Sequence, residues 1–277
     1  MTEAATQTPD VRYTRQAVTQ KTIWLDEKLF SLRVTRDPAF RFEPGQFARI
    51  GLALDPTAPD TPSEWRAYSM VSTPDESELE FFSVVVPSGK FSPPLAGLVA
   101  GNALFIDKTA FGFLTLERFV DGRDLWLIST GTGLSAYLSM LRDPATWQRF
   151  RRLIVIHGVR RAPELAYRQE LLDMARTFGQ ASAGQLIYVP ITSQEPLDPD
   201  LAPGLRCDLT SASRITHLLS SGELELRAGA TLDPDHARVM LCGNPAMVTE
   251  MRALLGARGF APGRRGIPGN LAVENYW

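Results

Sequence analysis

The sequence of 277 residues is poor in cysteine, with only Cys207 and Cys242. Two thiols are too few for a disulfide framework, and they exclude a site in which four cysteines hold zinc or an iron–sulfur cluster. We therefore expect both cysteines to be reduced thiols, as is usual in the cytoplasm.

The sequence also lacks a long apolar run and a large net charge. No stretch reaches the roughly 20 apolar residues of a membrane-spanning helix. The first residues, MTEAATQTPD, lack the basic and then apolar order of a signal peptide. A formal net charge of −2 argues against general binding of nucleic acid. These absences predict a cytoplasmic protein without membrane or nucleic-acid partners.

Basic side chains are nevertheless concentrated in one part of the sequence. Arg149, Arg151 and Arg152 lie close in the chain to Arg160 and Arg161. We interpret them as one basic cluster that could receive an acidic protein.

The first part of the chain has the pattern of short β-strands. From residue 12 to about residue 107, segments rich in β-branched and aromatic residues alternate with proline and glycine turns, and helical periodicity is nearly absent. The expected strands include 29–34, 46–52, 65–69 and 79–86. This spacing favours a small antiparallel barrel.

The pattern changes to strand followed by helix at about residue 124. The segments 125–141, 153–175, 186–191 and 239–255 each carry an apolar strand, a helix or both, as a parallel sheet requires. The predicted fold is therefore a two-domain β plus α/β architecture, with an antiparallel β-barrel at 12–118 and a parallel-sheet domain at 119–277.

A glycine turn follows the first strand of the second domain. Residues 125–128 predict a buried strand, Gly131 and Gly133 a tight turn, and 134–141 a helix. Such a turn directs free N–H groups and the positive end of a helix dipole toward one point, which suits a phosphate. It also fits the G-x-G-x-x-A dinucleotide fingerprint. The alternative is a turn that only lets the helix and strand pack.

The end of the next strand, 153–157, is followed by Arg160 and Arg161. A site for NAD usually has an acidic residue there, whereas arginine suits the 2′-phosphate of NADP. The alternative is a pair of solvated loop arginines.

Two segments of the barrel could contact a phosphate and a flat ring. Strand alternation places Arg66 and Tyr68 on one face, although an exposed arginine and a half-buried tyrosine also occur in ordinary strands. Gly89 and Lys90 precede Ser92, whose hydroxyl has the spacing of a helix N-cap. The second segment predicts either an anion site or a simple helix cap.

Five motifs in order resemble the ferredoxin–NADP reductase family, in particular its bacterial ferredoxin/flavodoxin branch. The resemblance spans the chain from about Thr22 to Trp277. The motifs are Arg66-x-Tyr68-Ser69, Gly89-Lys90-Phe91-Ser92, Gly131-Thr132-Gly133, Cys242-Gly243-Asn244-Pro245 and the tail 272–277, AVENYW. The resemblance implies a barrel that holds FAD, a second domain that binds NADP, and FAD in the cleft between them.

The resemblance also implies a role for individual residues. Arg66 would face the FAD pyrophosphate, Tyr68 would lie on the flavin ring, and Ser69 would reach toward the flavin N5. The implied FAD residues are Arg66, Ala67, Tyr68, Ser69, Phe82, Val84, Lys90, Phe91, Ser92, Thr132, Tyr276 and Trp277. The implied NADP residues are Gly131, Thr132, Gly133, Val159, Arg160, Ser193, Arg206, Cys242, Gly243 and Asn244.

Three residues are implied to act near the reacting atoms: Ser69, Cys242 and Glu274. Cys242 would line the nicotinamide pocket and Glu274 would lie beside the flavin. Without the resemblance, Cys242 would be interpreted as a buried structural thiol and Glu274 as an exposed glutamate of the tail.

The sequence departs from the family pattern at Gln194. The family commonly has a second arginine for the phosphate at this position, after the serine that corresponds to Ser193. Arg206 lies where the family has a further arginine and could compensate, so NADP remains the expected nucleotide.

We therefore predict a monomeric, FAD-dependent reductase that moves electrons between NADP(H) and ferredoxin or flavodoxin. A flavin is required because hydride carries two electrons and such carriers accept one at a time. Two alternatives remain: a flavin or quinone reductase that uses NADH, and a flavin-holding interaction subunit without turnover.

Overall fold

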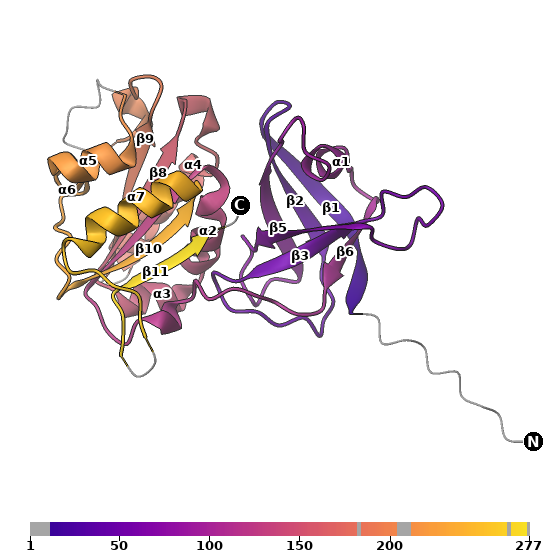
Figure 1. Ribbon diagram of the computed structural model, residues 1–277, viewed down its shortest axis with the longest axis horizontal. Helices are drawn as coiled ribbons and strands as arrows, with labels where there is room; N and C mark the ends of the chain where they lie inside the picture. Colours follow the sequence, from indigo (N-terminus) through magenta and orange to yellow (C-terminus); the bar gives the residue numbers. More distant parts are fainter. Residues whose placement is uncertain (1–11, 182–183, 204–211, 265–266, 276–277) are drawn as a thin grey trace, which may run out of the picture.

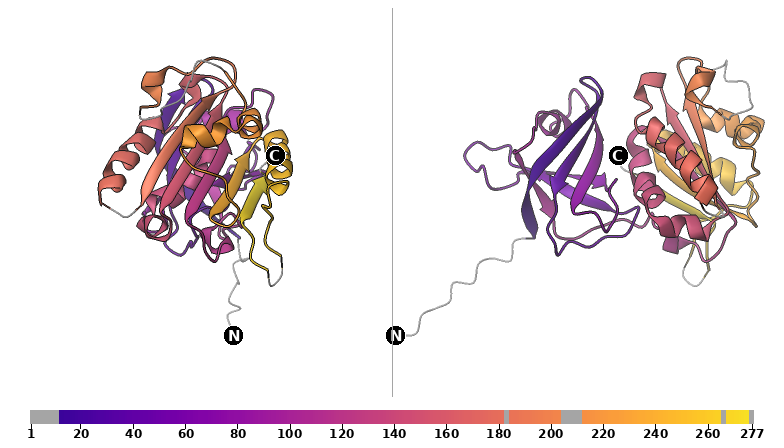
Figure 2. Two further views of the ribbon diagram at one scale, coloured as in Figure 1. Left: turned by 90° about the vertical axis from the view of Figure 1, so that its left-hand side faces the viewer. Right: turned by 180° about the vertical axis from the view of Figure 1, so that it is seen from behind.

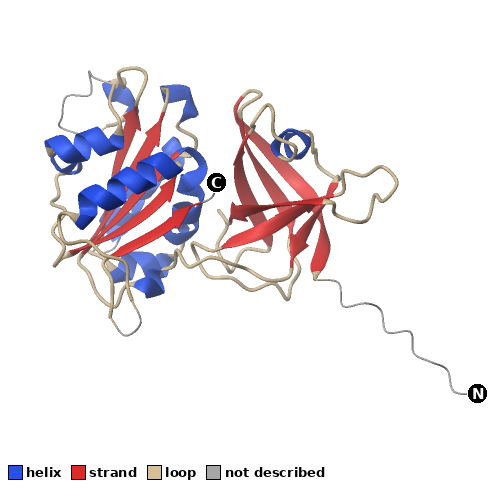
Figure 3. Cartoon of the chain, viewed as in Figure 1, coloured by secondary structure: helices blue, strands red, loops and turns tan. Residues whose placement is uncertain are grey.

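The computed structural model describes residues 12–181, 184–203, 212–264 and 267–275. They form two bodies that lie side by side, a sheet-rich one and a mixed one of helices and strands (Figures 1 and 3).

The first body is a curled antiparallel sheet with the strand order β4-β3-β6-β1-β2-β5. Its edges approach each other where Met70 forms a bridge with Phe81 and the Val71 N–H donates to the Glu80 carbonyl at 2.8 Å. The strands are β1 (Tyr13–Leu25), β2 (Leu29–Thr35), β3 (Phe47–Leu52), β4 (Glu64–Ser69), β5 (Glu78–Val84) and β6 (Ala103–Asp107). The expected barrel strands are confirmed, with β5 ending two residues earlier than expected.

The second body is a parallel sheet with the strand order β11-β10-β7-β8-β9. The strands are β7 (Asp124–Thr130), β8 (Arg152–Val159), β9 (Gln185–Thr192), β10 (Ala237–Gly243) and β11 (Leu271–Asn275). The predicted fold class, an antiparallel barrel followed by a parallel-sheet domain, is confirmed.

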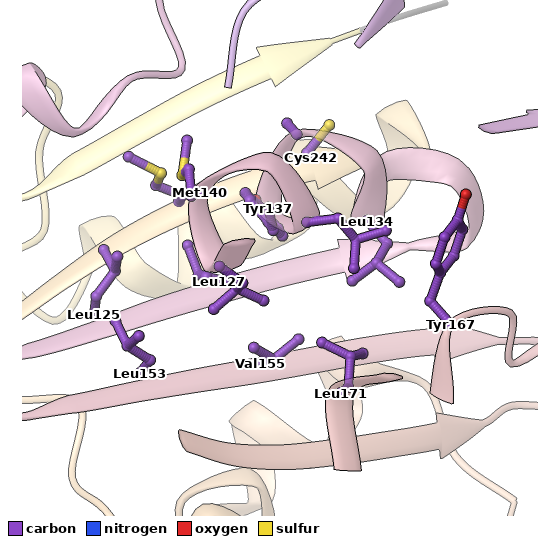
Figure 4. Close-up of a cluster of buried hydrophobic side chains, with 14 of the residues drawn as sticks. Leu125, Leu127, Leu134, Tyr137, Met140, Leu153, Val155, Tyr167, Leu171 and Cys242 are labelled. Carbon is purple, nitrogen blue, oxygen red and sulfur yellow. The ribbon is translucent and has the colours of Figure 1, made fainter. Parts of the chain in front are cut away.

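Helices cover both faces of the parallel sheet because its strands are apolar on both faces. Leu125, Leu127 and Val155 pack with α2 (Ser135–Arg142), α3 (Pro144–Arg149) and α4 (Arg168–Ala181), as Figure 4 shows in part. Trp126 and Ile154 on the opposite face pack with α5 (Ile215–Ser221), α6 (Glu223–Ala228) and α7 (Pro245–Gly256). Figure 2 shows these layers from two further sides.

The face with α2 packs toward the barrel. Its apolar cluster includes Leu29, Val71 and Phe82 of the barrel, so one core spans both bodies. The chain crosses between them once in the connection from β6 to β7, which contains the 3-10 turn η1 (Leu116–Arg118). The expected division between residues 118 and 119 falls in this connection.

Within the described ranges, no helix combines the length and apolar character needed to cross a bilayer.

Candidate functional site

A cavity of about 420 Å³ lies between the barrel and the glycine turn of the second body. It is lined by Arg66, Ala67, Tyr68, Ser69, Phe82, Ser83, Val84, Val86, Gly89, Lys90, Phe91, Ser92, Thr132, Gly133, Ser135 and Gly243. All the FAD residues predicted within the described part of the chain line this cavity. The structure thus brings together segments that are far apart in the sequence.

Strand β4 supplies one wall. The Arg66 guanidinium lies 5.8 Å from the centroid of the Phe91 ring, and its Nη1 donates to Glu64 at 3.3 Å and to the Trp65 carbonyl at 2.7 Å. The Tyr68 ring lies 6.0 Å from that of Phe91. Two aromatic faces and a half-exposed cation therefore meet at the same wall.

The Tyr68 hydroxyl accepts a hydrogen bond from Ser83 at 3.3 Å. Burial raises the pKa of Tyr68, although this hydrogen bond and the charge of Arg66 act in the opposite direction. The phenol is therefore neutral at physiological pH and can act as a hydrogen-bond donor.

The segment before α1 (Ser92–Ala96) forms a second wall. Ser92 was expected to be the N-cap of this helix, but the N-cap is Phe91 and no side chain caps the helix. The Ser92 hydroxyl instead accepts the Val86 N–H at 2.9 Å, because the chain folds back over the end of β5. This bond holds the Gly89–Lys90 turn against the barrel.

The glycine turn, η2 (Gly131–Leu134), follows β7 as expected and leads directly into α2. Gly131 has φ +53°, a conformation that glycine adopts without steric cost. A Cβ at Gly133 would lie 2.7 Å from the Cys242 carbonyl oxygen and 2.9 Å from the Gly243 Cα. Only glycine lets the turn approach the end of β10 this closely.

The end of β10 is fixed by Thr130. Gly243 has φ +129°, and a Cβ there would lie 2.3 Å from the Thr130 Oγ1. That hydroxyl oxygen accepts the Asn244 N–H at 2.8 Å. Asn244 is the N-cap of α7 and accepts the Ala246 N–H at 2.9 Å.

Cys242 is fully buried and does not line the cavity. Burial, followed by the charge of Glu274, raises the pKa of its thiol well above the ordinary value. The geometry matches the alternative interpretation, a buried thiol, and the implied role at the nicotinamide remains a prediction.

Glu274 is paired in register with Cys242 across β10 and β11. Its Oε1 would lie 2.8 Å from a Cβ at Gly112, which belongs to the connection between the two bodies. The carboxylate is therefore held at the boundary between the domains and is not on a free tail.

His157 lies buried in β8 beside the glycine turn. Burial lowers the pKa of His157 to about 4, although a backbone interaction with Gly131 acts in the opposite direction. Its Nδ1 lies 3.4 Å from the Tyr188 hydroxyl. The imidazole is therefore neutral near pH 7 and adds no charge beneath the turn.

Arg160 is exposed at the end of β8, beside the end of β9. The Ser193 N–H donates to the Val159 carbonyl at 3.0 Å, and the Gln194 N–H donates to the Arg160 carbonyl at 3.0 Å. Arg160 and Ser193, two of the predicted NADP residues, therefore lie together at the carboxyl edge of the sheet, where ligands of such sheets bind.

The expected single basic cluster is wrong. Arg152 begins β8 and Arg160 follows its last residue, so the two groups of arginines lie at opposite ends of the strand. An eight-residue strand is roughly 25 Å long. Arg151 and Arg152 instead line a separate cavity with Arg123 and Gln185 at the amino edge of the sheet.

Three predicted residues, Arg206, Tyr276 and Trp277, lie outside the described residues. Three residues of the cavity wall were not predicted: Ser83, Val86 and Ser135. Ser135 occupies a variable position of the fingerprint, and its hydroxyl donates to the Thr132 carbonyl at 2.8 Å. Proximity to the predicted motifs was the only sequence signal for these three.

The cavity suits a ligand that combines a flat ring with phosphates. Tyr68, Phe82 and Val84 offer an apolar surface, whereas Arg66 and Lys90 offer positive charge. Gly133 leaves its backbone open to the same space. No group of three or more potential metal ligands occurs among the residues that the structure describes.

Comparisons with known proteins agree with this arrangement. Residues 127–253 match the model of the oxidoreductase NAD-binding domain family. The chain is 39% identical over 269 residues to a ferredoxin–NADP reductase A of Sorangium cellulosum, covering 95% of this chain and 89% of that protein. It is 35% identical over 261 residues to a flavodoxin/ferredoxin–NADP reductase of Escherichia coli, covering 94% and 97%.

A solved structure of a ferredoxin NADP⁺ reductase is also similar to this chain. The ferredoxin NADP⁺ reductase of Neisseria gonorrhoeae with bound FAD and NADP is 31% identical and superimposes with a TM-score of 0.85, covering 97% of this chain and 100% of that one.

Proposed function

The chain belongs to the ferredoxin–NADP reductase family, and we infer from this membership that it is an FAD-dependent oxidoreductase. It transfers electrons between NADP(H) and a one-electron carrier protein, ferredoxin or flavodoxin. FAD, when bound, accepts two electrons as hydride and passes them on one at a time.

The observation that carries this function is the cavity between the two bodies. It places the aromatic and cationic side chains of the barrel opposite Thr132 and Gly133 of the nucleotide turn. Two ligands that must exchange hydride need to meet at such a boundary. A protein that only stored a flavin would not need the second turn in the same cavity.

We propose that the barrel residues divide between the two parts of FAD. Arg66 and Lys90 bind the pyrophosphate through charge-assisted hydrogen bonds. Tyr68, Phe82 and Val84 contact the ring system. Ser69, which is 7% exposed at the end of β4, presents its hydroxyl near the reacting atom.

We propose further that the carboxyl edge of the parallel sheet binds NADP(H). The N–H groups of Gly131, Thr132 and Gly133 receive the pyrophosphate at the start of α2. Arg160 and Ser193 receive the 2′-phosphate. Glu274 and Cys242 adjoin the place where the nicotinamide would enter.

An anaerobic titration tests the function against its alternatives. Purified protein should show a flavin spectrum that NADPH bleaches at a lower concentration than NADH, and the reduced protein should reoxidise on addition of oxidised ferredoxin or flavodoxin. Preferential bleaching by NADH, without transfer to a carrier, would favour a flavin or quinone reductase. A flavin that neither nucleotide bleaches would indicate an interaction subunit.

Arg160→Ala tests the nucleotide assignment. The variant should raise the KM for NADPH, relative to the KM for NADH, by a factor equivalent to about 2 kcal/mol of binding free energy. The reason is that a charge-assisted contact to the 2′-phosphate is lost. Arg161→Ala, at the adjacent exposed arginine, is the control and should have a much smaller effect. Equal changes for both nucleotides would refute the role of Arg160.

A monomeric state and a cytoplasmic location remain predictions from the sequence. The carrier is proposed to approach the carboxyl edge of the sheet, because Thr132 and Gly133 of that edge line the cavity, whereas Arg151 and Arg152 lie at the amino edge.

A further inference from the structure

The hairpin between β1 and β2 of the barrel touches the loop that follows Arg160. Lys28, in the turn of this hairpin, forms an ion pair with Glu164 Oε1. Glu164 ends the 3-10 turn η3 (Ala162–Glu164), and its Oε2 accepts the Arg160 N–H at 3.1 Å. One carboxylate thus joins the barrel to the backbone of the proposed 2′-phosphate arginine.

The contact is partly shielded from water. The Glu164 side chain is 12% exposed and that of Lys28 is 39% exposed. Charges in such a place interact more strongly than charges on the open surface.

The hairpin is held in place by a second contact with the same loop. Trp24 packs on Tyr167 with ring centroids 4.4 Å apart, and Ser31 Oγ lies 2.5 Å from the Tyr167 hydroxyl. Tyr167 is 2% exposed and has φ +58°, a backbone conformation that is costly for this residue type. The interface therefore holds the loop at Glu164 and again at Tyr167, three residues later.

The charge of Glu164 would by itself oppose phosphate binding. Its carboxylate lies next to the Arg160 backbone, and a 2′-phosphate bound by Arg160 would be repelled by an unpaired carboxylate there. Lys28 supplies the compensating positive charge from the other domain.

We propose that Lys28 and Glu164 form a specificity-determining pair for NADPH, a proposal that rests on the proposed function of Arg160. Glu164 is a positioning residue that orients the Arg160 loop. Lys28 cancels its charge, so that the site can accept a phosphate. The barrel domain thereby takes part in selecting the nucleotide that the second domain binds.

The test uses Lys28→Met, which keeps most of the aliphatic stem, and the double variant Lys28→Met/Glu164→Gln. The single variant should lower the ratio of kcat/KM for NADPH to that for NADH about tenfold, because it leaves a carboxylate unpaired near the phosphate. The double variant should restore the ratio to within about threefold of wild type, because glutamine keeps an acceptor for the Arg160 N–H without the charge.

Binding of the nucleotide fragment gives a readout apart from turnover. In calorimetry, Lys28→Met should weaken 2′-phospho-AMP about tenfold more than AMP, and the difference should shrink in high salt. Lys21→Met is the control, because Lys21 lies on β1 of the same barrel and donates to the Ala96 carbonyl. It should keep the wild-type ratios.

Equal losses for NADPH and NADH in Lys28→Met, or failure of the double variant to recover, would overturn the proposal. Arg160→Ala separates this failure from failure of the proposed function. If Arg160→Ala is selective for NADPH and Lys28→Met is not, the specificity pair is wrong and the 2′-phosphate site stands. If neither is selective, the 2′-phosphate site itself is wrong.

Discussion

Arg66 is a half-exposed arginine of β4 that contributes little to the stability of the fold. Its guanidinium lies over Phe91 and pairs with Glu64, a partner that is itself one-third exposed. Ion pairs of this kind contribute at most about 1 kcal/mol to stability. Its position in the wall of the cavity is therefore better explained by a ligand than by folding.

We expect Arg66→Ala to fold but to retain little FAD, because one pyrophosphate partner is lost while the apolar pattern of the barrel is unchanged. The ratio of flavin to protein absorbance after purification measures this. Arg49→Ala is a matched control, since Arg49 is also half-exposed, lies 5.5 Å from the Trp65 ring and is outside the cavity wall. Full flavin occupancy in Arg66→Ala would show that Arg66 is not needed to bind FAD.

Single residues with a distinctive chemistry could be predicted from the sequence, whereas their surroundings could not. Arg66, Tyr68 and Thr132, which were predicted from two different motifs, line the same cavity. Glu164 gave no such signal, because its importance comes from a partner 136 residues away, Lys28. Cys242 belonged to a predicted motif, yet its complete burial depends on β11 and on the glycine turn.

At the scale of elements, the glycine turn shows why two glycines separated by one residue are not equivalent. Gly131 faces open space with φ +53°, whereas Gly133 lies against the backbone at the end of β10. Backbone atoms of a buried strand cannot move aside as the end of a flexible side chain can. The turn therefore needs a residue that adopts a positive φ at position 131, and a residue without a side chain at position 133.

We expect Gly133→Ala to lower the free energy of unfolding by about 2–3 kcal/mol, through overpacking against Cys242 and Gly243. Gly131→Asn should cost less than about 1 kcal/mol, since asparagine tolerates the left-handed region and open space surrounds the site. Chemical denaturation of both variants gives the comparison. If Gly131→Asn lost more stability than Gly133→Ala, the positive φ at Gly131 would matter more for the turn than the close packing at Gly133.

Strands and helices with strong periodicity were predictable as elements. The strands around residues 125 and 153 are apolar on both faces, which indicated a covered parallel sheet before any pairing was known. The sequence did not indicate β11 as a fifth strand, because its five residues are recognisable only beside β10. The sequence also did not predict the register shifts in the pairing of the 13-residue β1 with β2.

At the scale of the whole molecule, a buried group of charges joins the two bodies. Glu80 of the barrel accepts hydrogen bonds from Arg142 of α2 at 2.8 Å and from the Tyr167 hydroxyl at 2.7 Å. Arg142 also binds Glu170 through two nitrogens, at 2.7 and 3.0 Å. Tyr167 in turn packs edge-on against Phe82 of the cavity wall. The geometry of the cavity therefore depends on this contact between domains.

Burial would raise the pKa of Glu80, but the charge and hydrogen bond of Arg142, the hydrogen bond from Tyr167 and the charge of Arg33 together outweigh it, so the pKa lies below its ordinary value. A carboxylate with a lowered pKa in the folded state contributes stability above its unfolded pKa of about 4.3 and loses it as the pH falls through the folded value. Acidification through this lowered pKa should therefore loosen the contact between the domains.

Glu80→Gln tests this whole-molecule role. At pH 7 the variant should be less stable than wild type by about 3 kcal/mol, because Arg142 loses one partner of a buried pair. The difference should shrink as the pH falls through the lowered pKa of folded Glu80, because Glu80 then becomes protonated in the wild type too. His157, with its pKa lowered to about 4, also destabilises the protein on acidification, but equally in both proteins, so its effect cancels. Melting curves of both proteins, recorded from pH 7 down to the lowest pH at which they fold, measure this difference in stability.

Glu170→Gln is the matched control, since Glu170 binds the same arginine but its side chain is 32% exposed, against 8% for Glu80. Solvent screens the outer partner, so its loss should cost about 1 kcal/mol or less. Because Tyr167 connects Glu80 to Phe82, Glu80→Gln should also change the flavin circular dichroism at pH 7, whereas Glu170→Gln should not. Equal destabilisation by the two variants, or a constant difference across the pH range, would show that Glu80 does not control the contact between the domains.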